Sequence, residues 1–223
     1  MGIQNITYFR QRETDTDTPI VIVHTFENEG EVLHRELIKT GCGSCCIAAV
    51  TVDKWEEDLS PWPAKRVFKG ESDFGSGADA HIADLTRTVL PEIREKTGSK
   101  GPCYIAGYSF AGLFALYSLY RTDIFAGAAS VSGSLWFPGF SEYALSHELR
   151  RKPDFLYFSL GDKECSTRNE LMKTVAEKTG LLHTHYQGLG INCAFEMNPG
   201  NHFTEPERRL AKGICRLLAE CGR

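Results

Sequence analysis

The chain has 223 residues and a formal net charge of −4, with 25 Lys and Arg against 29 Asp and Glu. This length fits one large domain, so we expect a single domain over residues 1–223. The absence of a basic excess argues against a nucleic acid or an anionic membrane as partner. No apolar run approaches the length of a membrane span, and the polar segment 1–18 lacks the apolar core of a signal peptide. We therefore expect a cytoplasmic protein that does not bind membranes.

The first quarter of the chain alternates between strand and helix patterns. Residues 5–11 fit a short outer strand, and the apolar run 19–23 predicts a buried strand. Residues 31–39 predict a helix that ends at Gly41 as its C-cap, and 46–52 predict the next strand.

Three of the eight cysteines, Cys42, Cys45 and Cys46, lie close together in the sequence. The spacing of Cys42 and Cys45 resembles a redox motif or half of a zinc site. A zinc site needs a second ligand pair at compact spacing, which the sequence lacks. A redox motif is expected at a strand-to-helix turn, whereas these cysteines run from a helix end into a strand. We interpret them as small apolar core residues in a reducing compartment, and predict no metal site.

The middle of the chain begins with a long segment, 53–77, that has no clear periodicity. A loop of that length inside a compact domain is usually functional. Residues 78–96 then carry apolar side chains at helical spacing, with a kink expected at Pro91.

In the second half, strand patterns again alternate with helix patterns. Strands are predicted at 127–131, 155–160 and 192–197, and helices at 142–149, from Thr167 to about Lys178, and after Thr204. The last two helices follow Thr-x-x-Glu sequences typical of capping boxes, Thr167 with Glu170 and Thr204 with Glu207. The alternation predicts an α/β fold, with a mostly parallel central sheet and helices on both faces.

Residues 103–114 carry the strongest functional signal. An apolar strand pattern, 103–106, runs into Gly107-Tyr108-Ser109-Phe110-Ala111, and helical spacing follows directly. Strand, sharp turn and helix with a serine at the turn is the context of a nucleophile elbow, although Ala111 stands where the usual pattern has glycine.

A serine hydroxyl needs a base within hydrogen-bond reach, and the base needs an anion that orients it. In α/β-hydrolases these groups follow the serine in the order acid, then histidine. Glu164 and Asp162 both follow the predicted strand 155–160, and His202 follows the strand 192–197. The order therefore indicates Ser109, Glu164 and His202 as catalytic residues, with Asp162 as the alternative acid.

The oxyanion of a tetrahedral intermediate needs two backbone N–H donors. Phe110, directly after the serine, is the first candidate. The second donor is expected in the segment after the strand 19–23, from Thr25 or Phe26.

With these residues placed, the sequence resembles the putative esterase family of α/β-hydrolases, which includes esterase D-like and ferric enterobactin esterase-like proteins. The resemblance covers most of the chain from Pro19 onward. The segments that carry it, beside the elbow, are 59–62, 75–80, 90–91, 131–136 and 199–203. It implies an α/β-hydrolase fold and a Ser109, Glu164, His202 triad that hydrolyses esters through an acyl-enzyme, without metal or cofactor. Asn201 departs from the family, whose members more often have a second glycine there.

The chain leaves no room for a large cap domain, so the loops 53–77 and 132–140 are expected to form the pocket walls. Trp62, Trp136 and Tyr108 predict an apolar or aromatic substrate pocket. The expected substrate is a small-molecule ester or thioester.

Two other functions remain open from the sequence. An acyltransferase would use the same triad with an alcohol in place of water, and a non-catalytic binding protein would keep the fold without the chemistry. A dinucleotide-binding fold is disfavoured, because residues 24–30 contain no G-x-G-x-x-G turn.

Overall fold

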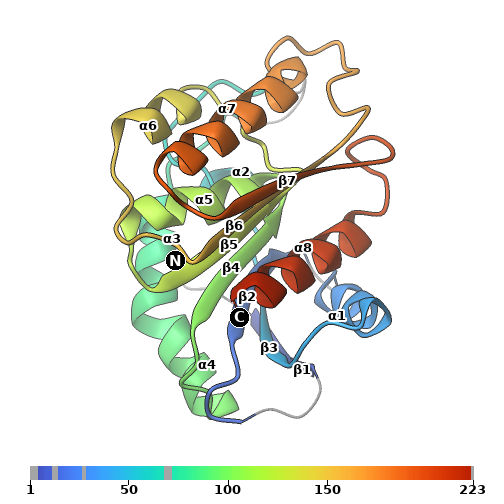
Figure 1. The fold of residues 1–223 in the computed structure, drawn as a ribbon. Helices are drawn as coiled ribbons and strands as arrows, with labels where there is room; N and C mark the ends of the chain where they lie inside the picture. Colours follow the sequence, from blue (N-terminus) through green and yellow to red (C-terminus); the bar gives the residue numbers. More distant parts are fainter. Residues whose placement is uncertain (1–4, 12–14, 27–28, 68–71, 222–223) are drawn as a thin grey trace.

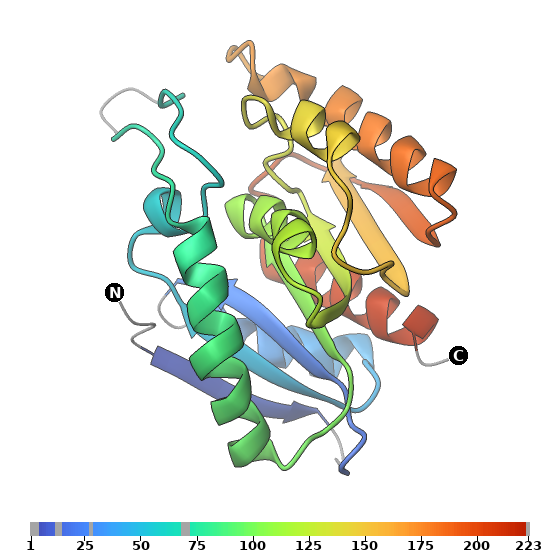
Figure 2. The ribbon, with the colours of Figure 1, turned by 90° about the vertical axis from the view of Figure 1, so that its left-hand side faces the viewer.

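The computed structural model describes residues 5–11, 15–26, 29–67 and 72–221. Within these ranges, one seven-stranded sheet has the order β1-β3-β2-β4-β5-β6-β7 (Figures 1 and 2). Strand β1 runs antiparallel to β3, and all other neighbours are parallel. The strands are β1 (Asn5–Gln11), β2 (Ile20–Thr25), β3 (Cys45–Thr51), β4 (Cys103–Tyr108), β5 (Phe125–Val131), β6 (Phe155–Gly161) and β7 (Cys193–Asn198).

Helices cover both faces of the sheet, which confirms the predicted α/β class. Helices α1 (Glu29–Thr40) and α8 (Pro206–Cys221) lie side by side on one face (Figure 1). The other face carries α3 (Ala78–Asp84), α4 (Leu90–Thr97), α5 (Phe110–Arg121), α6 (Phe140–Ser146) and α7 (Val175–Gly188).

Strand β2 shows how the sequence produces these two layers. Its residues are buried without exception, but successive side chains point to opposite faces of the sheet. Ile20 and Ile22 enter the core beneath α5, whereas Val21 and Val23 enter the core beneath α1 and α8. The continuous apolar run therefore fits a parallel strand that is covered on both sides.

The cysteines singled out in the sequence belong to these cores. Cys42, Cys45 and Cys46 are buried, and all three are thiols that form no disulfide. The pKa of Cys45 is raised far above its usual range, mainly by a hydrogen bond with Cys42 and next by burial. Cys45 therefore stays protonated and packs in the core, which does not fit a reactive thiolate.

The sheet contains one topological switch point, beside β2. The chain passes from β2 to β3 on one side and then returns to β4 on the other side. The carboxyl ends of β2 and β4 therefore lie next to each other, with crossovers leading away in opposite directions. In open parallel sheets this is the place where ligands bind.

The helix predicted over 78–96 is built in three parts. Between α3 and α4, residues Leu85–Val89 form a π-helical turn that ends two residues before Pro91. The wider turn accommodates a residue that cannot donate a backbone hydrogen bond. Gly98 ends α4 in the left-handed conformation.

Both predicted capping boxes are wrong. The helix predicted from Thr167 begins at Val175, after a short 3₁₀ turn at Met172–Thr174. The side chain of Asn169 takes the capping role, since its Oδ1 accepts N–H groups from Leu171 and Met172. Before α8, the hydroxyl of Thr204 accepts the N–H of Asn201 instead of capping the helix. In both cases, the threonine hydroxyl accepts a nearby backbone N–H outside the helix and so does not cap it.

The described parts of the aperiodic segment 53–77, which are 53–67 and 72–77, lie beyond the carboxyl ends of the strands (Figure 2). Its described residues include the short helix α2 (Trp55–Asp58) and one antiparallel bridge between Ala64 and Phe74. Over the described ranges, the helices are all too short or too polar to cross a membrane.

Candidate active site

Ser109 lies between β4 and α5 in a conformation that few residues other than glycine adopt. Its φ is 58° and its ψ is −122°. A Cβ atom at Gly107 would overlap the backbone carbonyl of Ala111, so this position requires glycine. Positive φ at a serine costs free energy, and such strain gathers at functional sites. The turn has the geometry of a nucleophile elbow.

The side chains of Ser109, His202 and Glu164 form a hydrogen-bonded chain. His202 Nε2 lies 3.1 Å from Ser109 Oγ, and His202 Nδ1 lies 2.9 Å from Glu164 Oε2. Asp162, the alternative acid, instead accepts the N–H of Gly200 at 2.8 Å. The structure therefore brings together the preferred set of three residues, drawn from the ends of three parallel strands.

The second oxygen of Glu164 is fully occupied. Glu164 Oε1 accepts hydrogen bonds from Ser132 Oγ at 2.7 Å, Gly161 N–H at 2.5 Å and Arg209 Nη2 at 2.8 Å. Burial alone would raise the pKa of Glu164, but hydrogen bonds from His202, Arg209, Ser132 and Gly161 outweigh it and lower the pKa to about 2. The carboxylate is thus held ionised beside the imidazole.

Ser132 and Arg209 were not predicted from the sequence. Arg209 is 5% exposed, although it lies near the start of the amphipathic helix α8. Its guanidinium bonds Glu164, Ser132 and the carbonyl oxygen of Asn201, the last at 3.1 Å. An arginine in the first turns of a helix gives no sequence signal of such burial.

The loop that carries His202 is held from two sides. Tyr108 Oη donates a hydrogen bond to the carbonyl oxygen of His202 at 2.7 Å, and Arg209 holds the carbonyl of Asn201. Asn201, the residue that departs from the family, accepts the N–H of Phe203 through its side chain at 2.9 Å. The asparagine therefore closes a local turn with its own side chain.

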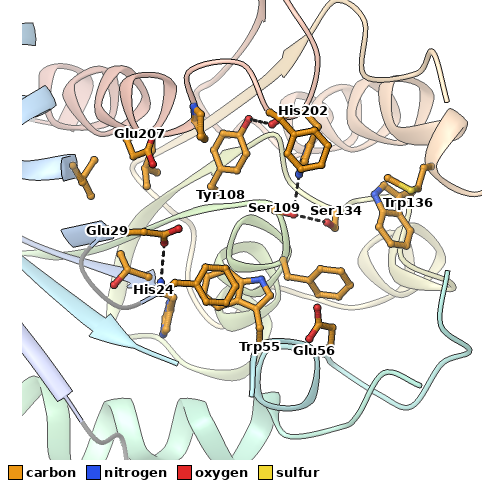
Figure 3. A pocket seen from close by; sticks show the side chains of 18 of the residues that line it. His24, Glu29, Trp55, Glu56, Tyr108, Ser109, Ser134, Trp136, His202 and Glu207 are labelled. Carbon is orange, nitrogen blue, oxygen red and sulfur yellow. Dashed lines mark hydrogen bonds between the residues drawn. The ribbon is translucent and has the colours of Figure 1, made fainter. Parts of the chain in front are cut away.

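A cavity of about 510 Å³ opens beside Ser109 (Figure 3). Its lining combines aromatic side chains with three carboxylates; the members used below are Phe26, Glu29, Trp55, Glu56, Phe74, Tyr108, Trp136 and Glu207. Tyr108 and Trp136 thus lie where the sequence predicted. Trp62 differs from that expectation, because it packs among Tyr117, Phe137 and Tyr143 and does not line the cavity. Trp55, on the short helix α2, was not predicted.

The two candidates for the second oxyanion donor point in different directions. The carbonyl oxygen of Thr25 accepts the N–H of Val52, the residue after β3, at 3.2 Å. The N–H and C=O of one strand residue point to the same side, so the N–H of Thr25 also faces β3, away from Ser109. Phe26 is the residue after β2, and continued alternation predicts that its amide lies on the β4 side. The backbone direction therefore favours Phe26, while Phe110 supplies the first N–H of α5, which has no acceptor within the helix.

His24, at the end of β2, also lines the cavity. Its ring packs against His81 and Phe114, and neither ring nitrogen has a hydrogen-bond partner among the described residues. Burial, reinforced by His81, lowers the pKa of His24 well below its usual value. His24 is therefore a neutral side chain whose ring nitrogens do not hydrogen-bond Ser109, whereas His202 does so directly.

Residues 28–177 match the model of the family described as Putative esterase. The match covers more than half of the chain, so the chain belongs to this family and is an enzyme that hydrolyses ester bonds. A curated relative, the uncharacterized protein YbbA of Bacillus subtilis (strain 168), is 22% identical over 173 residues, which are 74% of this chain and 68% of the relative.

Two solved structures show the same fold. The IroE-like serine hydrolase of Shewanella oneidensis has a TM-score of 0.74 at 15% identity, over 95% of this chain and 79% of that one. The siderophore hydrolase EstB of Aspergillus nidulans has a TM-score of 0.69 at 21% identity, over 95% and 89% of the two chains. The fold predicted from the sequence, that of the α/β-hydrolases, is confirmed.

Proposed function

We propose that the protein is a serine carboxylesterase that works through an acyl-enzyme, with Ser109 as nucleophile, His202 as general base and Glu164 as the orienting acid. One observation carries the proposal: Ser109, on a strained elbow that opens into the cavity, is hydrogen-bonded to His202, which is hydrogen-bonded to Glu164. The 3.1 Å contact between Ser109 and His202 also argues against a non-catalytic binding protein.

In the first half-reaction, Ser109 Oγ attacks the ester carbonyl carbon while His202 Nε2 takes its proton. The imidazolium that forms is stabilised by the ionised Glu164. The N–H groups of Phe110 and Phe26 are the proposed donors to the oxyanion. Collapse of the intermediate expels the alcohol, to which His202 returns the proton, and the acyl group stays on Ser109.

In the second half-reaction, His202 takes a proton from water, and the resulting hydroxide attacks the acyl-enzyme. The acid leaves and Ser109 recovers its proton. An alcohol acceptor could take the place of water, which would make the protein an acyltransferase. Analysis of products in the presence of added acceptor alcohols separates hydrolysis from transfer.

The substrate is proposed to be a small ester or thioester. The cavity of about 510 Å³ is within the range of small-molecule sites, and its walls carry Phe26, Trp55, Phe74 and Trp136. The two structural neighbours are described as a serine hydrolase and a siderophore hydrolase, and a siderophore ester is accordingly one member of the substrate series to test. A series that varies the acyl and alcohol parts separately identifies the preferred ester.

Covalent labelling tests the proposal directly. A fluorophosphonate probe is expected to label wild-type protein at Ser109, and Ser109→Ala is expected to abolish both labelling and ester hydrolysis while the protein stays folded. His202→Ala is expected to remove almost all turnover with little change in stability, because the ring lies on a loop and is 24% exposed. Labelling that persists in Ser109→Ala would assign the nucleophile to another serine.

A further inference from the structure

The backbone N–H of Phe26 is already occupied in the free protein. It donates a hydrogen bond to Glu29 Oε2 at 2.7 Å, which Figure 3 shows beside the cavity. The N–H of Glu29 in turn lies 3.3 Å from the carbonyl oxygen of Phe26. The carboxylate of Glu29 thus reaches back to an N–H three residues earlier, as in one half of a capping box, while the return contact goes to the backbone carbonyl of Phe26.

The surroundings of Glu29 disfavour the charged form of its carboxyl group. Burial raises the pKa of Glu29, the Phe26 N–H lowers it in part, and the nearby carboxylate of Glu207 raises it again. Both carboxylates line the cavity that contains Ser109, and neither lysine nor arginine is among the described residues that line it. The amide of Phe26 is thus the contact that stabilises the charge of Glu29.

The same amide is needed elsewhere during catalysis. A tetrahedral intermediate places a negative oxygen on its N–H donors, and a carboxylate is a strong competitor for such a donor. Among the described residues, no carboxylate accepts the N–H of Phe110, which is the first of α5 and has no acceptor within the helix. The two expected oxyanion donors therefore differ. The N–H of Phe110 is available, whereas the N–H of Phe26 is hydrogen-bonded to Glu29.

We propose that Glu29 is a positioning residue that occupies the second oxyanion donor, the N–H of Phe26, in the free enzyme and has to release it during each acylation. This inference rests on the proposed function of Ser109 and its partners. It adds that the resting enzyme works below the rate that its triad allows. Among the described residues, Glu29 makes no hydrogen bond to Ser109 or His202.

The test compares Glu29→Ala and Glu29→Gln with wild type on a neutral activated ester, 4-nitrophenyl butyrate. Glu29→Ala removes the competitor, and we expect kcat to rise about tenfold with a smaller change in KM, because the gain appears only when the oxyanion forms. Glu29→Gln keeps an uncharged acceptor for the amide, so its gain is expected to be smaller than that of Glu29→Ala.

Glu207→Gln is the matched control, since it removes one charge from the same cavity without a contact to the Phe26 amide. We expect no comparable gain in kcat from it. An equal gain would show that general negative charge, not the held amide, slows the enzyme, and would overturn the inference. An unchanged or lower kcat in Glu29→Ala would also overturn it, because Glu29 would then merely stabilise the start of α1.

The proposed function and this inference fail in different ways. Wild-type protein that neither hydrolyses the ester nor reacts with a fluorophosphonate would contradict the proposed function. Wild-type protein that does both, with no gain in Glu29→Ala, would contradict the inference alone.

Discussion

Arg209 Nη2 lies 2.8 Å from Glu164 Oε1, the carboxylate oxygen that faces away from His202. Both side chains are buried, with 5% and 3% of their surface exposed. The two oxygens of Glu164 therefore have separate tasks, one toward the imidazole and one toward the interior. Arg209 also bonds the carbonyl of Asn201, so one guanidinium fixes both the acid and the loop of the base.

Replacement of Arg209 is expected to affect stability and catalysis together. Arg209→Met leaves Glu164 as a buried charge without its cation, which typically destabilises a protein by about 3–5 kcal/mol. We expect a loss of this size in denaturant unfolding, and a fall in kcat measured on the folded fraction. Arg209→Lys keeps the charge but not the forked geometry, so an intermediate loss is expected. A stable and active Arg209→Met protein would contradict the role assigned to this ion pair.

The choice of Glu164 over Asp162 has a direct test. Glu164→Gln is expected to lower kcat by about two to four orders of magnitude, as loss of the orienting anion does in serine triads. Asp162→Asn is the matched control, because Asp162 contacts the same loop through the N–H of Gly200 and not the imidazole. We expect a much smaller loss from it. If the control loses more activity than Glu164→Gln, the two assignments must be exchanged.

The low pKa of Glu164 predicts a specific acid sensitivity. Its pKa falls from 4.5 to about 2 on folding. A depressed carboxyl pKa contributes stability that is fully present above pH 4.5 and is lost as the pH falls toward 2. The shift corresponds to about 3 kcal/mol. Between pH 4.5 and 2, the free energy of unfolding of wild type should therefore fall more steeply than that of Glu164→Gln. Parallel curves would rule out this contribution.

The close packing at Gly107 predicts that even a methyl group cannot be added there. Gly107→Ala places a methyl group against the backbone carbonyl of Ala111, where neither chain segment can move without distorting Ser109. We expect loss of activity and a large loss of stability. Ala111→Gly is the comparison variant, because it keeps the backbone carbonyl beside Gly107 and restores the glycine that the usual pattern has. It is expected to fold and to hydrolyse esters, at a cost of about 1 kcal/mol for glycine in a helix.

Much of this site could be predicted because its signals are local. A small residue two positions before Ser109, a strand before it and helical spacing after it define the elbow within 12 residues. Glu164 and His202 follow buried strands, and the carboxyl ends of parallel strands meet at one edge of the sheet. Hydrophobic periodicity was thus enough to predict the fold, and the positions directly after predicted strands were enough to predict the three proposed catalytic residues.

The residues that were missed depend on tertiary contacts. Arg209 looks like a surface residue of an amphipathic helix, and becomes buried only because Glu164 arrives from a distant strand. Trp62 lies in an aperiodic loop, where the sequence does not tell whether an aromatic ring faces a pocket or, as here, packs beside Tyr143. Thr167 illustrates the remaining error, since its hydroxyl accepts the N–H of Asn169 and leaves the capping role to that asparagine.

The charge of the cavity predicts how the enzyme selects among esters. Glu29, Glu56 and Glu207 line the cavity, and no lysine or arginine is among its described lining residues. Like charges in a partly enclosed site repel strongly, so an anionic ester is expected to enter poorly. We expect 4-nitrophenyl hemisuccinate to have a kcat/KM lower by about tenfold or more than that of 4-nitrophenyl butyrate. Salt should reduce the difference, because it screens the repulsion. Glu207→Gln should also reduce the difference in kcat/KM between the two esters, mainly by lowering the KM of the anionic ester. Equal rates for the two esters at low salt would show that these carboxylates do not face the bound substrate.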